Sequence, residues 1–256
     1  MELVRYERID NYGLITIDRP EKRNSLSIQV IAELRRAVAM ATEDRAVRSL
    51  VITGAGGEAF SAGGDLVEMG ASDDPIAEHR GRGALGELFL DMWSAGKPTV
   101  GRVDGYCLAG GFGIAMACDY VVASRKSRFG TPEVRVGLWP YMITVPMLRS
   151  MAPKLALRLM MTGETIDAAE AERLGFVEMV EDSIALDRRV AELTDQFAAS
   201  SPQAIALGRT AFYSVVNREA AGALANLQVG LSLALGMSDA REGLQAFKGK
   251  RRPHWT

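Results

Sequence analysis

The pattern of apolar and polar positions divides the chain into two parts. Up to about residue 141, short apolar runs alternate with glycine-rich loops and with segments whose apolar residues recur at helical spacing. The pattern predicts strands at residues 3–6, 13–18, 48–53, 98–103 and 120–123, and helices at 27–43, 78–95 and 110–117. Ser27 is expected to cap the first helix, and Asp10-Asn11 to form a hairpin turn. This alternation predicts an α/β fold with mostly parallel strand pairing.

After residue 141, nearly every segment is predicted to be helical. The helices are expected at 142–151, 155–161, 168–174, 184–199, 202–216 and 219–235, with one strand at 176–180. The last helix has an apolar face too wide for a thin cap to bury, made of Ala221, Leu224, Leu227, Leu231 and Leu235. We therefore expect a core in residues 1–195 and a helical oligomerisation region in residues 196–256.

Composition and charge exclude several classes of protein. Hydrophobic residues make up 48% of the chain and charged residues 24%, as is usual for a globular protein. The formal net charge of −2 gives no general attraction for a polyanion, so no nucleic-acid partner is expected. No apolar run reaches the roughly 18 residues of a membrane span, and the first ten residues have no secretory pattern. We expect a cytoplasmic protein with no membrane partner, in which Cys107 and Cys118 are buried free thiols.

Two glycine-rich loops provide the candidate chemistry. Residues 60–66 (Phe-Ser-Ala-Gly-Gly-Asp-Leu) and 104–113 (Asp-Gly-Tyr-Cys-Leu-Ala-Gly-Gly-Phe-Gly) each follow a predicted strand and precede a helix. Glycine allows a ligand to approach the backbone closely, and the first turn of a helix leaves its N–H groups unpaired. Two such loops can direct N–H groups at one oxygen atom. A short helical turn is predicted at 65–69, followed by a mobile polar stretch at 71–75 that would gate the site.

These loops and several further motifs resemble the crotonase superfamily, also called the enoyl-CoA hydratase/isomerase family. The resemblance covers nearly the whole chain and includes residues 19–26, 61–66, 97–98, 105–119, 129–133, 159–163, 171–177, 242–247 and 250–251. It implies a crotonase-like spiral of repeated ββα units with a helical C-terminal trimerisation region. It also implies an acyl-CoA thioester as substrate, a homotrimer or hexamer, no metal, and no cofactor beyond the CoA moiety of the substrate.

The resemblance implies roles for individual residues. The backbone N–H groups of Gly64 and Gly110 would form an oxyanion hole, and Glu133 would transfer protons. Residues that would contact the substrate or its CoA moiety are Arg23, Ala62, Asp65, Leu66, Tyr106, Leu108, Gly111, Gly113, Pro132, Tyr141, Phe247 and Lys250. The last two often act from a neighbouring subunit. Asp65 and Asp119 are expected to have structural roles within their motifs.

Gly113 decides which reaction is expected. The family's hydratases usually have a second glutamate at this position, so that two carboxylates hold the water that is added. A single glutamate suits isomerisation better, because it can take a proton from C2 and return it at C4. Isomerisation is therefore slightly favoured, with enoyl-CoA hydration and catalytically weak acyl-CoA binding as alternatives. The segment 137–143 also replaces the family's small glycine-rich turn, and Tyr141 there would supply a hydroxyl group or narrow the pocket.

Overall fold

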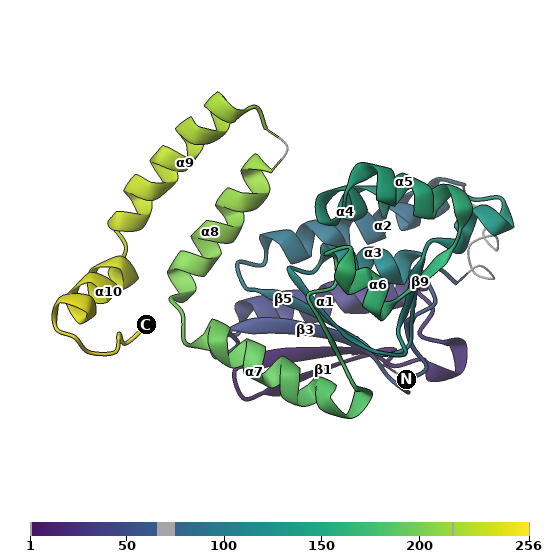
Figure 1. Cartoon of the computed structure of the whole chain (residues 1–256), viewed down its shortest axis with the longest axis horizontal. Helices are drawn as coiled ribbons and strands as arrows, with labels where there is room; N and C mark the ends of the chain where they lie inside the picture. Colours follow the sequence, from purple (N-terminus) through teal and green to yellow (C-terminus); the bar gives the residue numbers. More distant parts are fainter. Residues whose placement is uncertain (1, 66–74, 217, 256) are drawn as a thin grey trace.

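The structure is a computed structural model that describes residues 2–65, 75–216 and 218–255 (Figure 1). Its larger sheet has six strands in the order β1-β2-β3-β5-β7-β10. They are β1 (Val4–Ile9), β2 (Tyr12–Ile17), β3 (Ser49–Gly54), β5 (Thr99–Val103), β7 (Tyr120–Ser124) and β10 (Met179–Glu181). The predicted hairpin joins β1 and β2, and every other pairing in this sheet is parallel. The last strand begins at Met179 and not at the predicted residue 176, because the Phe176 N–H bonds to the Ala171 carbonyl of the preceding helix.

A second sheet was not predicted from the sequence. It has four strands in the order β4-β6-β8-β9, namely β4 (Ala59–Ser61), β6 (Tyr106–Leu108), β8 (Arg128–Gly130) and β9 (Thr165–Asp167). The first three run parallel to one another, and β9 is antiparallel to β8. In the chain, β4, β6 and β8 directly follow β3, β5 and β7 of the larger sheet, so each unit contributes one strand to each sheet.

Helical segments complete each of these units. The chain order β3-β4-α2, β5-β6-α3 and β7-β8 followed by a 3₁₀ helix confirms the expected spiral of ββα units. The helices of this part are α1 (Ile28–Glu43), α2 (Pro75–Ser94), α3 (Gly110–Ala117), α4 (Thr144–Ser150), α5 (Pro153–Thr162), α6 (Ala168–Arg173) and α7 (Leu186–Ala198). Ser27 caps α1 as predicted, since its Oγ accepts a hydrogen bond of 3.2 Å from the Val30 N–H.

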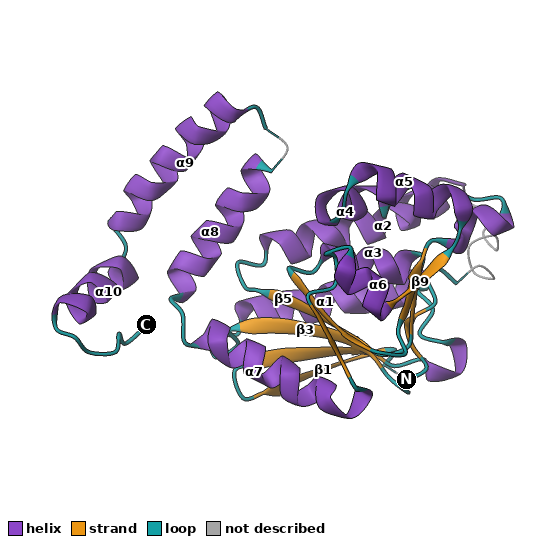
Figure 2. Ribbon diagram, in the orientation of Figure 1, coloured by secondary structure: helices purple, strands orange, loops and turns teal. Residues whose placement is uncertain are grey.

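The larger sheet separates two apolar layers (Figure 2). Val51, Val100 and Val122, from three adjacent strands, pack on one face against α7. Side chains on the other face join a larger core with α1 and α3. All eight residues of α3 are buried, which fixes the start of this helix at Gly110. The predicted burial of the free thiols Cys107 and Cys118 is confirmed.

The three last helices form an arm that extends from the core (Figure 1). They are α8 (Pro202–Val215), α9 (Ala220–Leu235) and α10 (Ser238–Lys248), of which the sequence predicted the first two. No residue of α8 or α9 is buried, although α9 is rich in leucine. No single helix of the described residues is long and apolar enough to cross a membrane, although α9 and α10 would reach that length as a pair bent by 69°.

Candidate active site

The loop that follows β4 is fixed to the segment before α1. The Leu26 N–H donates a 2.8 Å hydrogen bond to the Gly63 carbonyl, and the Asp65 N–H donates a 3.1 Å bond to the Leu26 carbonyl. These bonds form an isolated parallel bridge between Leu26 and Gly64. Neither bond uses the Gly64 N–H, and within the described part of the chain this group has no hydrogen-bond acceptor. The loop is thus bonded to the segment before α1, and it presents a donor that no described residue pairs.

The loop that follows β6 presents a second donor. The Ala109 N–H donates a 2.9 Å hydrogen bond to the Gly130 carbonyl at the end of β8. Helix α3 begins at the next residue, and its first intrahelical bond runs from the Gly113 N–H to the Ala109 carbonyl, at 3.1 Å. The Gly110 N–H precedes that bond and, among residues 2–65, 75–216 and 218–255, has no acceptor.

The two donors lie close together. A Cβ atom placed on Gly110 would lie 3.9 Å from the Gly64 nitrogen, and one placed on Gly63 would lie 3.2 Å from the Gly110 nitrogen. A Cβ on Gly111 would lie 2.6 Å from the Ser61 Cβ, so glycine is needed at position 111 for the loops to pack. The structure thus brings together the two glycine loops, as the sequence predicted.

Glu133 follows the third parallel strand, β8. The Ala109–Gly130 hydrogen bond connects the end of β8 to the start of α3, and the chain then enters the 3₁₀ helix Pro132–Val136. One carboxylate oxygen of Glu133, Oε2, is buried and has no hydrogen-bond partner among the described residues. Burial raises the pKa of Glu133 to about 6. The loops after β4, β6 and β8 follow three parallel strands, so the two backbone donors and the Glu133 carboxyl group come from the same edge of the smaller sheet.

The space beside Gly113 is filled with apolar side chains. A Cβ atom on Gly113 would overlap Ile143 Cγ2 and would lie 2.8 Å from the Cβ of the same residue. It would also lie 3.1 Å from the Phe89 ring. Ile143 and Phe89 are each 2% exposed. No side chain fits at position 113 unless these neighbours move.

Asp65 and Arg23 take part in ion pairs at the rim of the β4 loop. Asp65, 7% exposed, pairs with Arg19 at 3.3 Å and with Lys22 at 3.6 Å. Arg23 pairs with Glu58 at 2.9 Å, and both side chains are largely exposed. Asp65 is therefore held in a buried ion pair, which agrees with the structural role expected for it, and its contact with the substrate stays a prediction. Arg23 lies at the surface near the loop.

Other residues that the sequence singled out fall into three groups. Those in or beside the three loops are Ala62, Tyr106, Leu108, Gly111 and Pro132. Tyr141 precedes α4 and is 76% exposed. Phe247 is 84% exposed on α10, and Lys250 follows that helix, so a single chain does not bring them to the loops (Figure 1). Leu66, the helical turn predicted at 65–69 beyond Asp65, and most of the gate predicted at 71–75 lie outside the described residues.

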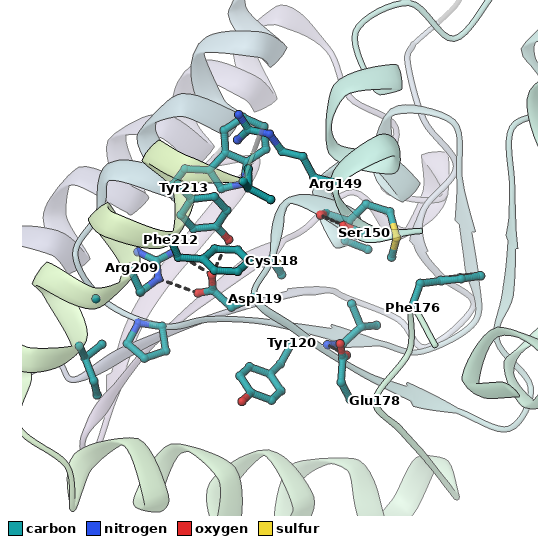
Figure 3. A pocket seen from close by; sticks show the side chains of 18 of the residues that line it. Cys118, Asp119, Tyr120, Arg149, Ser150, Phe176, Glu178, Arg209, Phe212 and Tyr213 are labelled. Atoms are coloured by element: carbon teal, nitrogen blue, oxygen red, sulfur yellow. Dashed lines mark hydrogen bonds and ion pairs between the residues drawn. The ribbon is translucent and has the colours of Figure 1, made fainter. Parts of the chain in front are cut away.

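A separate cleft of ≈ 600 Å³ lies between α8 and the core, and its lining does not include the glycine loops or Glu133 (Figure 3). There Arg209 donates to both Asp119 carboxylate oxygens, at 2.9 and 3.1 Å, and the Tyr213 hydroxyl donates to Asp119 Oδ1 at 2.6 Å. Asp119 also accepts a 2.7 Å hydrogen bond from the Thr99 N–H. These bonds confirm the structural role expected for Asp119, which connects the arm to the larger sheet. No sequence pattern indicated Arg209 or Tyr213, because the contacts join residues 90 or more positions apart.

Comparison with known proteins agrees with this arrangement of sheets and loops. The profile of the enoyl-CoA hydratase/isomerase family matches residues 7–256. The chain belongs to this family of enzymes. It is 30% identical to a crotonyl-CoA hydratase of Syntrophomonas wolfei over 99% of this chain and 98% of that protein. It is 31% identical to a short-chain-enoyl-CoA hydratase of Clostridium acetobutylicum, over 98% of this chain and 97% of the relative.

Solved structures of the hydratase/isomerase family have the same fold. A crystal structure of an enoyl-CoA hydratase from Mycobacterium smegmatis superimposes with a TM-score of 0.93 at 30% identity, covering 99% of this chain and 98% of the other. The human enoyl-CoA hydratase domain-containing protein 3 gives a TM-score of 0.92 at 27% identity, over 99% and 100% of the two chains. The crotonase fold expected from the sequence is thereby confirmed.

Proposed function

We propose that this member of the family is an acyl-CoA enzyme that moves the double bond of an enoyl-CoA ester, with Glu133 as the one proton-transferring group. The observation that supports this reaction is the packing at Gly113. Ile143 and Phe89 fill the space in which the family's hydratases usually have their second glutamate. Position 113 therefore carries no second carboxylate that could hold an added water, and the space beside Gly113 leaves no room for one.

The mechanism starts with the thioester carbonyl oxygen in the oxyanion hole. This oxygen accepts hydrogen bonds from the Gly64 and Gly110 N–H groups, which belong to two loops in close contact. As C2 loses a proton, negative charge grows on the oxygen, and each fixed donor contributes about 3–4 kcal/mol to the transition state. The N-terminal end of α3, which starts at Gly110, adds the favourable end of its dipole.

Glu133 moves the proton. Its carboxylate takes the proton from C2 of a 3-enoyl-CoA ester, and the electron pair of that C–H bond becomes part of a dienolate. The same carboxylic acid then returns the proton at C4, so the double bond moves from C3–C4 to C2–C3. A pKa of about 6 suits both steps, because the group is ionised near neutral pH and still returns its proton readily. No electrons leave the substrate, so the reaction needs no redox cofactor.

Hydration of a 2-enoyl-CoA ester is the second candidate. The names of the Syntrophomonas and Clostridium relatives favour it, since both are hydratases. The oxyanion hole and Glu133 would have the same roles in hydration, and only the means of holding the water would differ. Catalytically weak acyl-CoA binding remains a third possibility, motivated by the same Gly113.

A parallel assay of 2-enoyl-CoA and 3-enoyl-CoA esters separates these reactions. We expect migration of the double bond in 3-enoyl esters to be faster than hydration of 2-enoyl esters of the same chain length. Glu133→Gln should bind the esters nearly as tightly while turnover falls by at least about 100-fold. Faster hydration would support the second candidate, and binding without turnover of any ester would support the third. Full activity in the glutamine variant would remove Glu133 from the mechanism.

A further inference from the structure

Ala109 has a backbone conformation that side-chain-bearing residues rarely adopt. Its φ of 50° and ψ of −127° correspond to the first central position of a type II′ turn, which glycine usually occupies. The N-caps Ser27 (φ −83°, ψ 167°) and Asp167 (φ −84°, ψ 171°), by contrast, have the extended backbone usual at this position. Ala109 is held in place by the hydrogen bond of its N–H to Gly130 and by the one that its carbonyl accepts.

This conformation determines where the second donor points. The Gly110 N–H belongs to the peptide group that joins residues 109 and 110, and the ψ angle of Ala109 sets the orientation of that group. If residue 109 had the extended conformation, the peptide group between residues 109 and 110 would be rotated from its present orientation. The unusual ψ angle therefore directs the Gly110 N–H relative to Gly64.

The methyl group of Ala109 lies between the two glycine loops. A Cβ atom placed on Gly63 would overlap the Ala109 Cβ, and Gly63 itself has a φ of 96°. Gly63 directly precedes the first donor, as Ala109 directly precedes the second. The space between the loops therefore holds one methyl group and not two.

We propose that Ala109 is a positioning residue that sets the separation and orientation of the Gly64 and Gly110 N–H groups through the contact of its methyl group with Gly63. The inference rests on the proposed function, because it assigns these N–H groups to the thioester oxygen. Glycine would adopt the same backbone angles more easily than alanine. The methyl group therefore does not stabilise the backbone conformation of Ala109. Its contribution is the contact with Gly63 across the loops.

The test uses four proteins: the wild type, Ala109→Gly, Gly63→Ala and the double variant. Ala109→Gly should fold with an unchanged or higher melting temperature and a KM within about twofold of the wild type, because the backbone strain is relieved and the CoA contacts are untouched. Its kcat should fall about tenfold, because the donors are no longer held at one spacing. Gly63→Ala should lose more activity and stability, since two methyl groups then compete for one space.

The double variant tests the contact itself. With one methyl group again between the loops, it should recover part of the kcat and melting temperature that Gly63→Ala loses. If the effects of the two substitutions on kcat and on the melting temperature are simply additive, residues 63 and 109 share no contact and the inference is wrong. An unchanged kcat in Ala109→Gly, in a protein that turns over an enoyl-CoA ester, overturns the positioning role and leaves the proposed function intact.

A binding measurement keeps the two proposals distinguishable if no ester is turned over. Butyryl-CoA and its thioether analogue S-butyl-CoA differ only in the carbonyl group, so the ratio of their dissociation constants reports the donors at the oxygen. We expect the wild type to prefer butyryl-CoA and Ala109→Gly to lose at least about half of that preference. An equal preference in both proteins contradicts the inference, whatever reaction the enzyme catalyses.

Discussion

The buried carboxyl group of Glu133, to which we assign the proton transfer, has an energetic cost for the folded protein. Water is removed from one of its oxygens without any replacement among the described residues, and the pKa rises from an ordinary 4.5 to about 6. The folded state therefore binds this proton more tightly than the unfolded chain does. Its stabilising contribution is complete below pH 4.5 and is lost as the pH rises through about 6.

Glu133→Gln should accordingly stabilise the protein above pH 6. A shift of this size corresponds to at most about 2 kcal/mol in the free energy of unfolding. We expect the glutamine variant to exceed the wild type by up to that amount at pH 7.5 and by no more than about 0.4 kcal/mol at pH 4.5, measured by denaturant unfolding at both values. Glu21→Gln, at an exposed position, serves as the control and should show no such difference. A pH-independent effect of Glu133→Gln would contradict the assignment.

The same carboxyl group predicts how activity depends on pH. Glu133 must be ionised to take a proton, so kcat/KM should fall as the pH decreases through about 6. Rates measured between pH 5 and pH 8, with the folded fraction checked at each value, will give the apparent pKa. A plateau that extends to pH 5 would mean that another group accepts the proton.

Gly113 allows a second test at the scale of one residue. Gly113→Ala places a methyl group against Ile143 and Phe89 and should lower the free energy of unfolding by about 1–3 kcal/mol, a typical cost of overpacking. Gly83→Ala in α2 is a matched control, because a Cβ there meets no atom within 4 Å. Chemical denaturation of this control should give a free energy of unfolding equal to or slightly above that of the wild type. Equal effects in the two variants would show that the space beside Gly113 is open.

At the scale of elements, the attachment of the arm depends on the partly buried ion pair between α8 and the loop before β7. Arg209 and Asp119 are only 10% and 17% exposed, and Tyr213 adds a hydrogen bond. Arg209→Met should destabilise the protein by about 3 kcal/mol, because Asp119 would lose its countercharge in a partly buried place. Arg173→Met removes a solvent-exposed pair with Glu170 and should leave stability nearly unchanged. Thermal unfolding of both variants will compare them, and similar losses would contradict the role of the ion pair.

The elements also show how far the sequence determined the fold. Strands of the larger sheet contain five or six residues, apart from β10, and their apolar runs were recognised. The strands of the smaller sheet contain three residues each, too few to show an alternating pattern, and α10 has only a few apolar residues around Gly243. The glycine loops were located because each lies between a predicted strand and a predicted helix, a position that can be read from local sequence. The apolar filling around Gly113, in contrast, depends on Ile143, thirty residues further along the chain.

At the scale of the whole molecule, the arm exposes more apolar surface than a single chain can cover. Leu224, Val229, Leu231, Leu233 and Leu235 of α9 are all between 59% and 67% exposed. Burial of such side chains stabilises an assembly by roughly 1.5–3 kcal/mol each. The expected homotrimer or hexamer would cover this surface and would bring Phe247 of one copy toward the loops of another.

Leu231→Lys should weaken that assembly. A charge in the apolar face of α9 should shift the sedimentation profile toward smaller species, and the shift should grow on dilution. Ile184→Lys is the control, because Ile184 is 95% exposed on the core, outside the arm. A profile unchanged in the Leu231 variant would place the contact between subunits elsewhere.

The two donors at Gly64 and Gly110 are main-chain atoms, and this has a consequence for how such a protein can change over generations. A replaced side chain cannot delete a peptide N–H group, except where proline is introduced. In the proposed mechanism, mutations that alter Glu133, Ile143 or Phe89 would therefore change the reaction or the accepted acyl group and leave activation of the thioester in place. The scaffold would then exchange one chemistry for another without passing through a form that has lost the means to activate a thioester.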